Sequence, residues 1–168
     1  QPKGAVVLHQ GESNLQEWYV NALNSAAGHR YLLLSAVGFD LTQKNVFCPL
    51  ITGGTLYIPE SDIYDERTIL KEIASNGIHF VNCAPSAFYP IVEAAQSSDY
   101  RELRSLRRVV LGGEPIQLKL LHDWLSHQNC AGQIVNSYGP TECSDVVVAG
   151  PLDYITSAYD SVTLGAPI

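Results

Sequence analysis

The chain has 168 residues, of which 46% are apolar and 16% charged, and these proportions are ordinary for a globular domain with a core of its own. A formal net charge of −7 argues against a nucleic-acid-binding surface, because such a surface needs clustered Lys and Arg. The single basic cluster, at residues 101–108, is short and interrupted, and it is expected to be a solvated segment before a strand. No apolar run approaches the roughly 20 residues of a membrane span, so neither nucleic acid nor membrane is an expected partner.

The cysteines and the amino terminus give two further expectations. The four cysteines are widely spaced and form no Cys-x-x-Cys or Cys/His ligand pattern, so neither a zinc site nor a disulfide framework is indicated. Free thiols in a reducing cytoplasm are the expected state. The chain contains no Met and begins with Gln1, which suggests a piece of a longer protein.

Short apolar runs alternate along the chain with segments of helical periodicity. Strands are predicted at residues 4–9, 30–37, 55–59, 78–84, 106–113 and 132–138, with two further short strands at 144–150 and 161–165. Helices are predicted at residues 13–28, 41–54, 65–77, 85–96 and 116–128, and a loop at 150–160. Ser13 or Asn14 is expected to cap the first helix, and Pro49 to bend or break the second. Strands and helices in this order predict an α/β fold, a three-layer arrangement with a mostly parallel sheet flanked by helices, in which residues 1–168 form a single subdomain.

Ligands of open parallel sheets bind outside the carboxyl ends of the strands, so the residues that follow each strand are the candidates for a site. Four strand ends carry polar residues or glycines: Phe39 and Asp40; Asn82 and Cys83; Gly112, Gly113 and Glu114; and Asn136, Ser137 and Tyr138. Their convergence on one edge predicts a single pocket.

Three motifs at these ends each allow two interpretations. Asp40, in "GFDLTQ", could cap the next helix or pair with a cationic ligand group. The glycines of "LGGEP" could serve packing or let the backbone approach a flat ring, and Glu114 could be a helix-start carboxylate. In "NSYGPTE", Tyr138 offers a stacking face and Glu142 a hard oxygen ligand for Mg²⁺, although the segment could also be a plain turn.

Taken together, the motifs resemble the adenylate-forming, AMP-binding enzymes, in the form found in amino-acid adenylation domains of nonribosomal peptide synthetases. "NSYGPTE" is similar to the core signature, and "GFDLTQKNVFCPLITGGTLYI" and "LGGEP" to upstream segments in the right order. "PKG" near the start resembles the end of the phosphate-binding loop, and "LGAPI" the stretch after this subdomain. The resemblance covers the whole chain and implies a flavodoxin-like subdomain that contains the substrate pocket.

The resemblance also implies roles for individual residues. Asp40 would pair with the α-ammonium of an amino acid, and Phe39 would border the channel for the carboxylate and carrier arm. The side-chain pocket would comprise Leu41, Lys44, Asn82, Val110, Gly112, Ser137, Asp145 and Val146. The nucleotide would contact Gly113, Glu114, Asn136, Tyr138 and Thr141, and Glu142 would bind Mg²⁺, so that Thr141 and Glu142 are the candidate catalytic residues. Lys3 matches the last lysine of the phosphate loop.

The implied reaction joins an amino-acid carboxylate to the α-phosphate of ATP, giving aminoacyl-AMP, which then passes to a phosphopantetheine thiol on a partner carrier domain. The polar pocket set favours a polar side chain without naming one, and Lys44 could hold a substrate carboxylate or amide, or pair with Asp145 instead. Because the body of the phosphate loop and the C-terminal lysine of the family are not among these residues, the isolated piece is expected to be inactive.

Three other interpretations share some of these features. An acyl- or aryl-CoA ligase fragment would differ in substrate class, and Asp40 speaks against it. A non-catalytic α/β binding module would bind nucleotide without dependence on an amino acid. An engineered unit made for transplantation between synthetases would share the same pocket.

Overall fold

The computed structural model describes residues 4–60, 63–152 and 162–168. The α-helices are α1 His9–Leu23, α2 Leu41–Thr52, α3 Glu66–Asn76, α4 Pro85–Ala95 and α5 His122–Leu125. The strands are β1 Arg30–Leu33, β2 Thr55–Tyr57, β3 Phe80–Cys83, β4 Arg108–Gly112, β5 Gln133–Tyr138, β6 Val148–Pro151 and β7 Ala166–Pro167. Four short 3-10 helices complete the set: η1 Gln96–Ser98, η2 Arg101–Leu103, η3 Leu118–Leu120 and η4 Thr141–Cys143.

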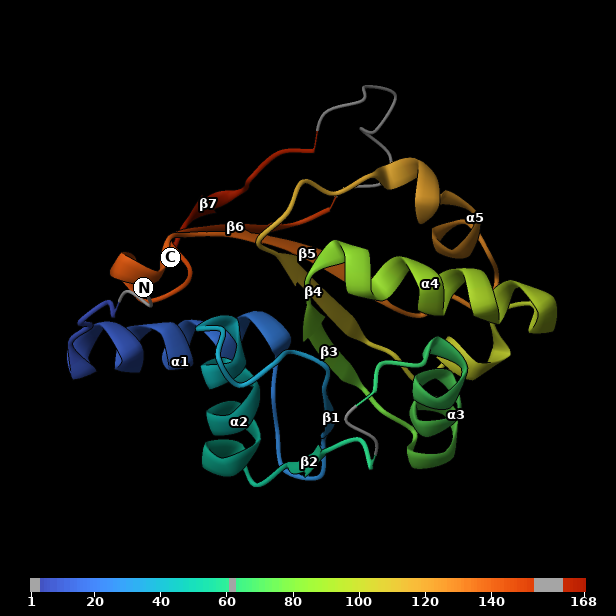
Figure 1. Ribbon diagram of the computed structural model, residues 1–168, viewed down its shortest axis with the longest axis horizontal. Helices are drawn as coiled ribbons and strands as arrows, with labels where there is room; N and C mark the ends of the chain where they lie inside the picture. Colours follow the sequence, from blue (N-terminus) through green and yellow to red (C-terminus); the bar gives the residue numbers. More distant parts are fainter. Residues whose placement is uncertain (1–3, 61–62, 153–161) are drawn as a thin grey trace.

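The strands form one sheet in the order β2-β1-β3-β4-β5-β6-β7. β1 to β5 are parallel, and β6 and β7 pair antiparallel to their neighbours. Figure 1 shows α1 and α2 on one side of this sheet and α3, α4 and α5 on the other. The mostly parallel three-layer α/β arrangement predicted from the sequence is therefore confirmed.

Local sequence signals explain where several helices begin and end. Asp65 caps α3 by accepting a hydrogen bond from the Thr68 amide at 2.8 Å, and Gly77 ends the helix in the left-handed region at φ 55°. Pro85 stands at the start of α4, where its missing N–H costs nothing. Pro49 lies inside α2, which nevertheless runs on to Thr52 and ends at Gly53.

Five sequence predictions about secondary structure are wrong. Residues 4–9 are not a strand, because α1 already begins at His9, and Ser13 bonds to the His9 carbonyl inside the helix instead of capping it. This helix ends at Leu23, before Gly28, with Asn24 in the left-handed conformation. The helix predicted at 116–128 divides into η3 and the four-residue α5. Residues 162–165 are not a strand, and the next strand is β7; residue 161 and most of the predicted 150–160 loop lie outside the described residues.

Each face of the sheet packs against its own set of helices. The side toward α3 and α4 holds a large apolar cluster that includes Leu32, Val81, Phe88, Val109 and Trp124. The opposite side holds a smaller cluster from Leu15 and Tyr19 to Val110 and Val135, together with the buried polar side chains of α2.

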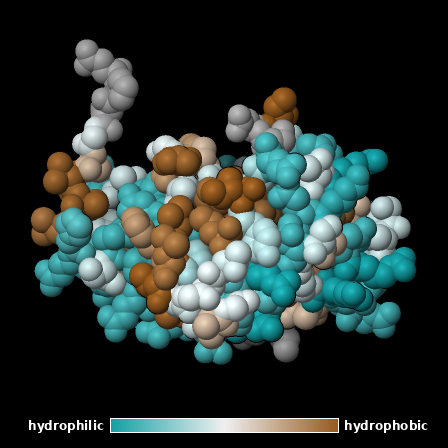
Figure 2. Space-filling view, turned by 90° about the horizontal axis from the view of Figure 1, so that it is seen from below, coloured by the Kyte–Doolittle hydropathy of each residue, from teal (hydrophilic) through white to brown (hydrophobic). Residues whose placement is uncertain are grey.

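Some large apolar side chains remain exposed. Phe47, Leu50 and Ile51 on α2 are 45%, 68% and 61% exposed. Figure 2 shows hydrophobic side chains gathered in a band across the face seen from below. In the part of the chain that the structure describes, no helix combines the length and the hydropathy needed to cross a bilayer.

Candidate functional site

Two adjoining cavities open at the carboxyl edge of the parallel strands, where the sequence predicts the site. The inner cavity has a volume of about 330 Å³ and the outer cavity about 620 Å³. Both are lined by Gly113, Glu114, Ser137 and Gly139. The cavities therefore meet at the ends of β4 and β5, so that one ligand could extend from the first into the second.

The inner cavity brings together most of the predicted pocket residues. Its lining includes Phe39, Asp40, Leu41, Gly112, Ser137, Asp145 and Val146. Lys44, Asn82 and Val110 do not line it; they are 0%, 1% and 1% exposed and lie within the layer between α2 and the sheet. Sequence reasoning missed Leu34, Ser35, Ala36 and Ala87, which also line the cavity. The first three directly follow β1, so the strand-end rule could have found them, whereas Ala87 in α4 carries no such signal.

The register of the sheet explains why the predicted residues share one face. Val110 pairs with Asn82 and Val135, and Gly112 pairs with Ser137 two residues further along. Since side chains alternate between the two faces of a strand, these positions point toward α1 and α2, while the intervening Leu111 points toward the other layer. A Cβ at Gly112 would lie 2.6 Å from Ser137 Oγ, so a side chain there would displace Ser137 from the cavity wall.

Asp40 caps α2 and also lines the inner cavity, so its position is compatible with both interpretations of its sequence. It stands at the N-cap of α2, and its Oδ1 accepts a hydrogen bond from the Leu41 amide at 2.8 Å. It also lines the inner cavity and is only partly buried. The cap bond therefore orients a carboxylate that still faces the cavity, next to Phe39, which is 67% exposed.

Lys44 and Asp145 form a buried ion pair that links α2 to the segment after η4. Lys44 Nζ donates to Asp145 Oδ2, and the two side chains are 0% and 12% exposed. Burial lowers the pKa of Lys44 and raises the pKa of Asp145, while their mutual attraction opposes both shifts. Of the two roles that the sequence left open for Lys44, the structure shows the pairing with Asp145.

Asn82 belongs to a hydrogen-bonded network beneath the cavity. Its Nδ2 donates to the Leu41 carbonyl at 3.1 Å and to Asn45 Oδ1 at 2.9 Å. Asn45 Nδ2 in turn donates to Ser35 Oγ and to the Asn82 carbonyl. The Oδ1 atom of Asn82 is buried and has no hydrogen-bond partner. This network fixes the start of α2 against β3.

The outer cavity contains four of the predicted nucleotide contacts: Gly113, Glu114, Asn136 and Tyr138. Tyr138 is 53% exposed at the end of β5, so its ring face is accessible. Asn136 Nδ2 donates to the Thr163 carbonyl at 2.8 Å, which fixes the orientation of its amide. Gly113 has φ 84°, a left-handed conformation that favours glycine.

Glu114 caps a helix that is distant in sequence. Its two carboxylate oxygens accept hydrogen bonds from the Ser86 amide at 3.1 Å and the Ser86 hydroxyl at 2.9 Å. Ala84, at the N-cap of α4, provides no side-chain cap, so Glu114 supplies the carboxylate that the helix start favours. Glu114 is thus a helix-start carboxylate, but for α4 and not for the segment that follows it.

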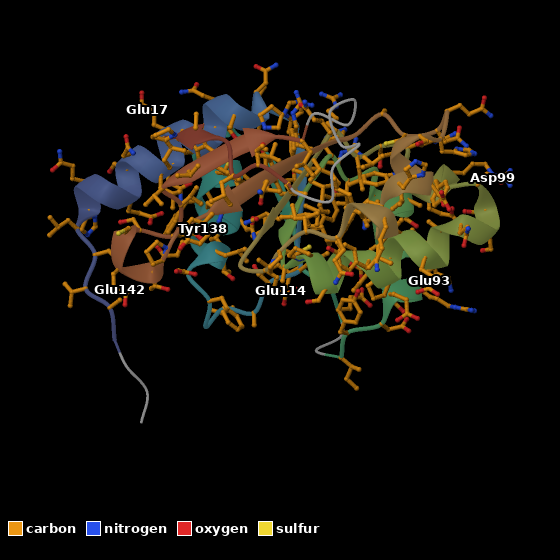
Figure 3. The ribbon with its side chains drawn as sticks, turned by 90° about the horizontal axis from the view of Figure 1, so that it is seen from above. Glu17, Glu93, Asp99, Glu114, Tyr138 and Glu142 are labelled. Carbon is orange, nitrogen blue, oxygen red and sulfur yellow. The ribbon has the colours of Figure 1, made fainter. Side chains whose placement is uncertain are left out.

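Thr141 and Glu142 lie in η4, are exposed, and line neither cavity. Figure 3 shows Tyr138 between Glu114 and Glu142 in the view from above. The described residues contain no group of three or more His, Cys, Asp or Glu side chains suited to a metal. A single free carboxylate still fits Mg²⁺, which binds through one or two carboxylates together with substrate phosphates and water. Lys3 lies outside the described residues.

Comparison with known proteins places this geometry in a family. The family model described as AMP-binding enzyme matches residues 1–168. Surfactin synthase subunit 2 of Bacillus subtilis (strain 168) is 33% identical over 174 residues, which are 99% of this chain and 5% of that protein. Tyrocidine synthase 3 of Brevibacillus parabrevis is 30% identical over 99% of this chain, and the matched region is only 2% of that protein. The chain thus spans a small part of the curated relatives.

Solved structures agree with the sequence comparison. The nonribosomal peptide synthetase FmoA3 (S1046A) superposes with a TM-score of 0.91 at 30% identity, over 99% of this chain and 18% of that one. Its form bound to α-methyl-L-serine-AMP gives a TM-score of 0.90 at 29% identity, over 100% of this chain and 19% of that one. The chain therefore belongs to the AMP-binding enzyme family, among the adenylation domains of nonribosomal peptide synthetases, as its motifs predicted.

Proposed function

We propose that the chain forms the amino-acid pocket and part of the ATP site of a domain that activates an α-amino acid as aminoacyl-AMP and passes it to a carrier protein. The meeting of the two cavities at Gly113, Glu114, Ser137 and Gly139 is the observation that carries this proposal. Adenylation requires a carboxylate and an α-phosphate to touch, so the amino-acid and nucleotide pockets must adjoin.

In the inner cavity, Asp40 would accept the substrate α-ammonium. Its carboxylate is oriented by the Leu41 amide and partly shielded from water, which strengthens an ion pair with a bound cation. The ammonium distinguishes an α-amino acid from the acyl and aryl acids of other family members. A matching ligand occurs in a relative, since one FmoA3 structure contains α-methyl-L-serine-AMP.

In the outer cavity, Tyr138 would stack on the adenine ring, and Asn136 would accept a hydrogen bond from the adenine amino group through Oδ1. The bond from Asn136 Nδ2 to Thr163 supports that orientation, because it leaves the oxygen as the free end of the amide. Gly113 and Glu114 would border the base through their backbone. ATP is the expected nucleotide, and another FmoA3 structure contains its analogue AMPPNP.

Thr141 would contact a phosphate, and Glu142 would hold Mg²⁺ together with the phosphate oxygens. A bound Mg²⁺ neutralises the charge that develops on the phosphates during the reaction. No Lys or Arg among the described residues lines either cavity. The 168-residue chain on its own is therefore expected to show no useful rate of adenylation, since preorganised positive charge is the main source of catalysis in phosphoryl chemistry.

The test is pyrophosphate exchange by a complete adenylation domain of the family in which residues 1–168 replace the matching segment. We expect exchange to depend on one or a few amino acids and to disappear in the Asp40→Ala variant. The cap bond alone cannot explain such a loss, so Asp40→Asn, which keeps an N-cap acceptor, serves as the matched control and should also be inactive. Exchange with aryl or acyl acids, undiminished in both variants, would identify a ligase of a different substrate class. Robust exchange by the isolated chain would contradict its expected inactivity.

A further inference from the structure

The inner cavity offers no cation to a substrate side chain. The charged residues that line it are Asp40, Glu114 and Asp145, all of which are acidic, and the Cys83 thiol, also in the lining, has its pKa raised to about 12 by burial. The neighbouring cation, Lys44, is 0% exposed, donates to Asp145, and lies 5.9 Å from the centre of the Tyr19 ring. Its ammonium is therefore enclosed between α1, α2 and Asp145 and is not presented to the cavity.

Most polar groups at and beneath the cavity already bond to the protein, although the Ser35 hydroxyl in its lining accepts from Thr42 Oγ1 and Asn45 Nδ2 and keeps its own proton. Both hydrogen-bonding contacts of the Asn82 amide nitrogen go to protein acceptors, Leu41 O and Asn45 Oδ1. The Asn82 oxygen, in a side chain only 1% exposed, has no partner. Ser137 Oγ, in the cavity wall, already donates to the Leu111 carbonyl at 3.3 Å, so it too faces the cavity as an acceptor.

These two observations select the chemistry of the side chain that fits. A substrate carboxylate would leave water and meet acidic groups without a cation to pair with, and an unpaired buried charge is costly. A hydroxyl, amide or amine could donate to Ser137 Oγ, the acceptor in the cavity wall. Resting on the proposed function, we propose that this pocket selects an amino acid whose side chain carries a hydrogen-bond donor and no negative charge, and that it rejects acidic side chains.

The experiment compares amino acids of nearly equal shape in the complete adenylation domain that carries residues 1–168. The pairs are Asn with Asp, Gln with Glu, Thr with Val, and Tyr with Phe. Within each pair that supports exchange, the donor-bearing and uncharged member should have the higher kcat/KM, by at least about tenfold, because the other member leaves buried polar groups or a buried charge without a partner. Asp and Glu should remain at background.

The outcomes separate this inference from the function on which it rests. Exchange with no amino acid at all would overturn the proposed function and this inference with it. Exchange that is faster with Asp than with Asn, with Glu than with Gln, with Val than with Thr, or with Phe than with Tyr would overturn the inference and leave the proposed function intact.

A variant series tests whether the ion pair is the cause. Asp145→Asn removes the carboxylate that holds Lys44, so the ammonium becomes available and the ratio of kcat/KM for Asp over Asn should rise more than tenfold. The double variant Lys44→Met with Asp145→Leu removes both charges and should not raise that ratio. A folded Asp145→Asn variant with an unchanged ratio would show that the pair does not exclude acidic substrates. If this variant fails to fold, the matched amino-acid pairs on the unaltered chain still decide the proposal.

Discussion

The two faces of the sheet differ in how they are filled. On the side of α3 and α4, the space between helix and sheet is apolar. The rings of Phe88 and Trp124 pack edge to face there, with their centroids 5.4 Å apart. On the side of α1 and α2, the helix turns polar side chains inward, and Thr42, Lys44 and Asn45 are at most 3% exposed. A buried helix surface is normally apolar, so this face departs from the pattern that stability alone would favour.

The two faces of the sheet therefore have different roles, one in stability and one in positioning the site. Apolar packing contributes stability in proportion to buried area and tolerates little change in volume. Buried polar groups cost free energy unless each has a partner, but they hold directional groups in fixed positions. The α3/α4 face therefore supports the fold, while the α1/α2 face positions the walls of the inner cavity.

The largest loss of stability is expected on the apolar face. Phe88→Ala should lower the free energy of unfolding by about 3–5 kcal/mol, because Phe88 is fully buried and its removal leaves a cavity against Trp124. Urea denaturation of the chain measures the change. The exposed Leu50→Ala is the control and should change it by less than about 0.5 kcal/mol. In the complete domain, Phe88→Ala should leave the preference among amino acids unaltered.

Removing one member of the Lys44–Asp145 ion pair should lower the free energy of unfolding more than removing both. Lys44→Met leaves the Asp145 carboxylate without its partner, and removing one member of such a pair costs about 3–5 kcal/mol when the remaining charge is buried. Because Asp145 keeps 12% exposure, we expect the lower end of that range. The double variant Lys44→Met with Asp145→Leu should recover most of the loss. Equal stabilities of the single and double variants, measured by urea denaturation, would show that the two charges do not depend on each other.

Disrupting the hydrogen-bond network around Asn82 should lower the free energy of unfolding by a smaller amount. Asn82→Ala removes one donor from the Leu41 carbonyl and one from Asn45 Oδ1, although the Tyr19 hydroxyl still donates to Asn45 Oδ1 at 3.4 Å. We expect a loss of about 1–2 kcal/mol in the free energy of unfolding, since a buried acceptor that loses its partner costs about 1–3 kcal/mol. Part of this loss is offset, since the unpartnered Asn82 oxygen is removed as well. Asn14→Ala, on the exposed side of α1, is the matched control and should be nearly neutral. A neutral Asn82→Ala would mean that the network does not hold α2 to β3.

The smallest effect is expected at the rim of the apolar face, where Asp65 caps α3. The hydrogen bonds from Thr68 lower the pKa of Asp65, so its carboxylate stabilises the folded state at neutral pH. A lowered pKa means that this contribution is complete above about pH 3.8, the ordinary value, and is lost as the pH falls below it. The difference in Tm between the chain and its Asp65→Ala variant should thus shrink in acid. Asp65→Asn, which still caps but does not titrate, should show no such shrinkage relative to Asp65→Ala.

Much of the fold follows from local signals in the sequence. The strands around β1 to β5 and the helices α2, α3 and α4 were predicted within a few residues, because Asp65, Gly53 and Gly77 mark helix ends and short apolar runs mark parallel strands. The start of α1 was not predicted, since Leu8 at its N-cap makes no capping bond. The prediction of a single helix at 116–128 is wrong because tertiary contacts override the local helical pattern. Tyr89 of α4 accepts a hydrogen bond from the Gln117 amide, and Leu121 and Trp124 are buried in the core, which fixes the segment in two short turns.

The site could be predicted in position but not in its contacts. The rule for strand ends placed Asp40, Gly112 and Ser137 at one edge, and the structure brings them into one cavity. It could not decide between the roles of Lys44, because its partner Asp145 is 101 residues away and depends on how the chain returns after β5. The functional roles of Thr141 and Glu142 remain predictions from the resemblance.

The contact between Glu114 and Ser86 makes the start of α4 a reporter of the outer cavity. The Ser86 amide proton is protected by a carboxylate that borders both cavities, and not by a residue of its own turn. A nucleotide that draws Glu114 toward it would release this proton, whereas one that leaves Glu114 in place would not. The rate of amide hydrogen exchange at Ser86, compared with that at Val92 in the same helix, would therefore reveal ligand arrival 28 positions away in the sequence, without any label in the site.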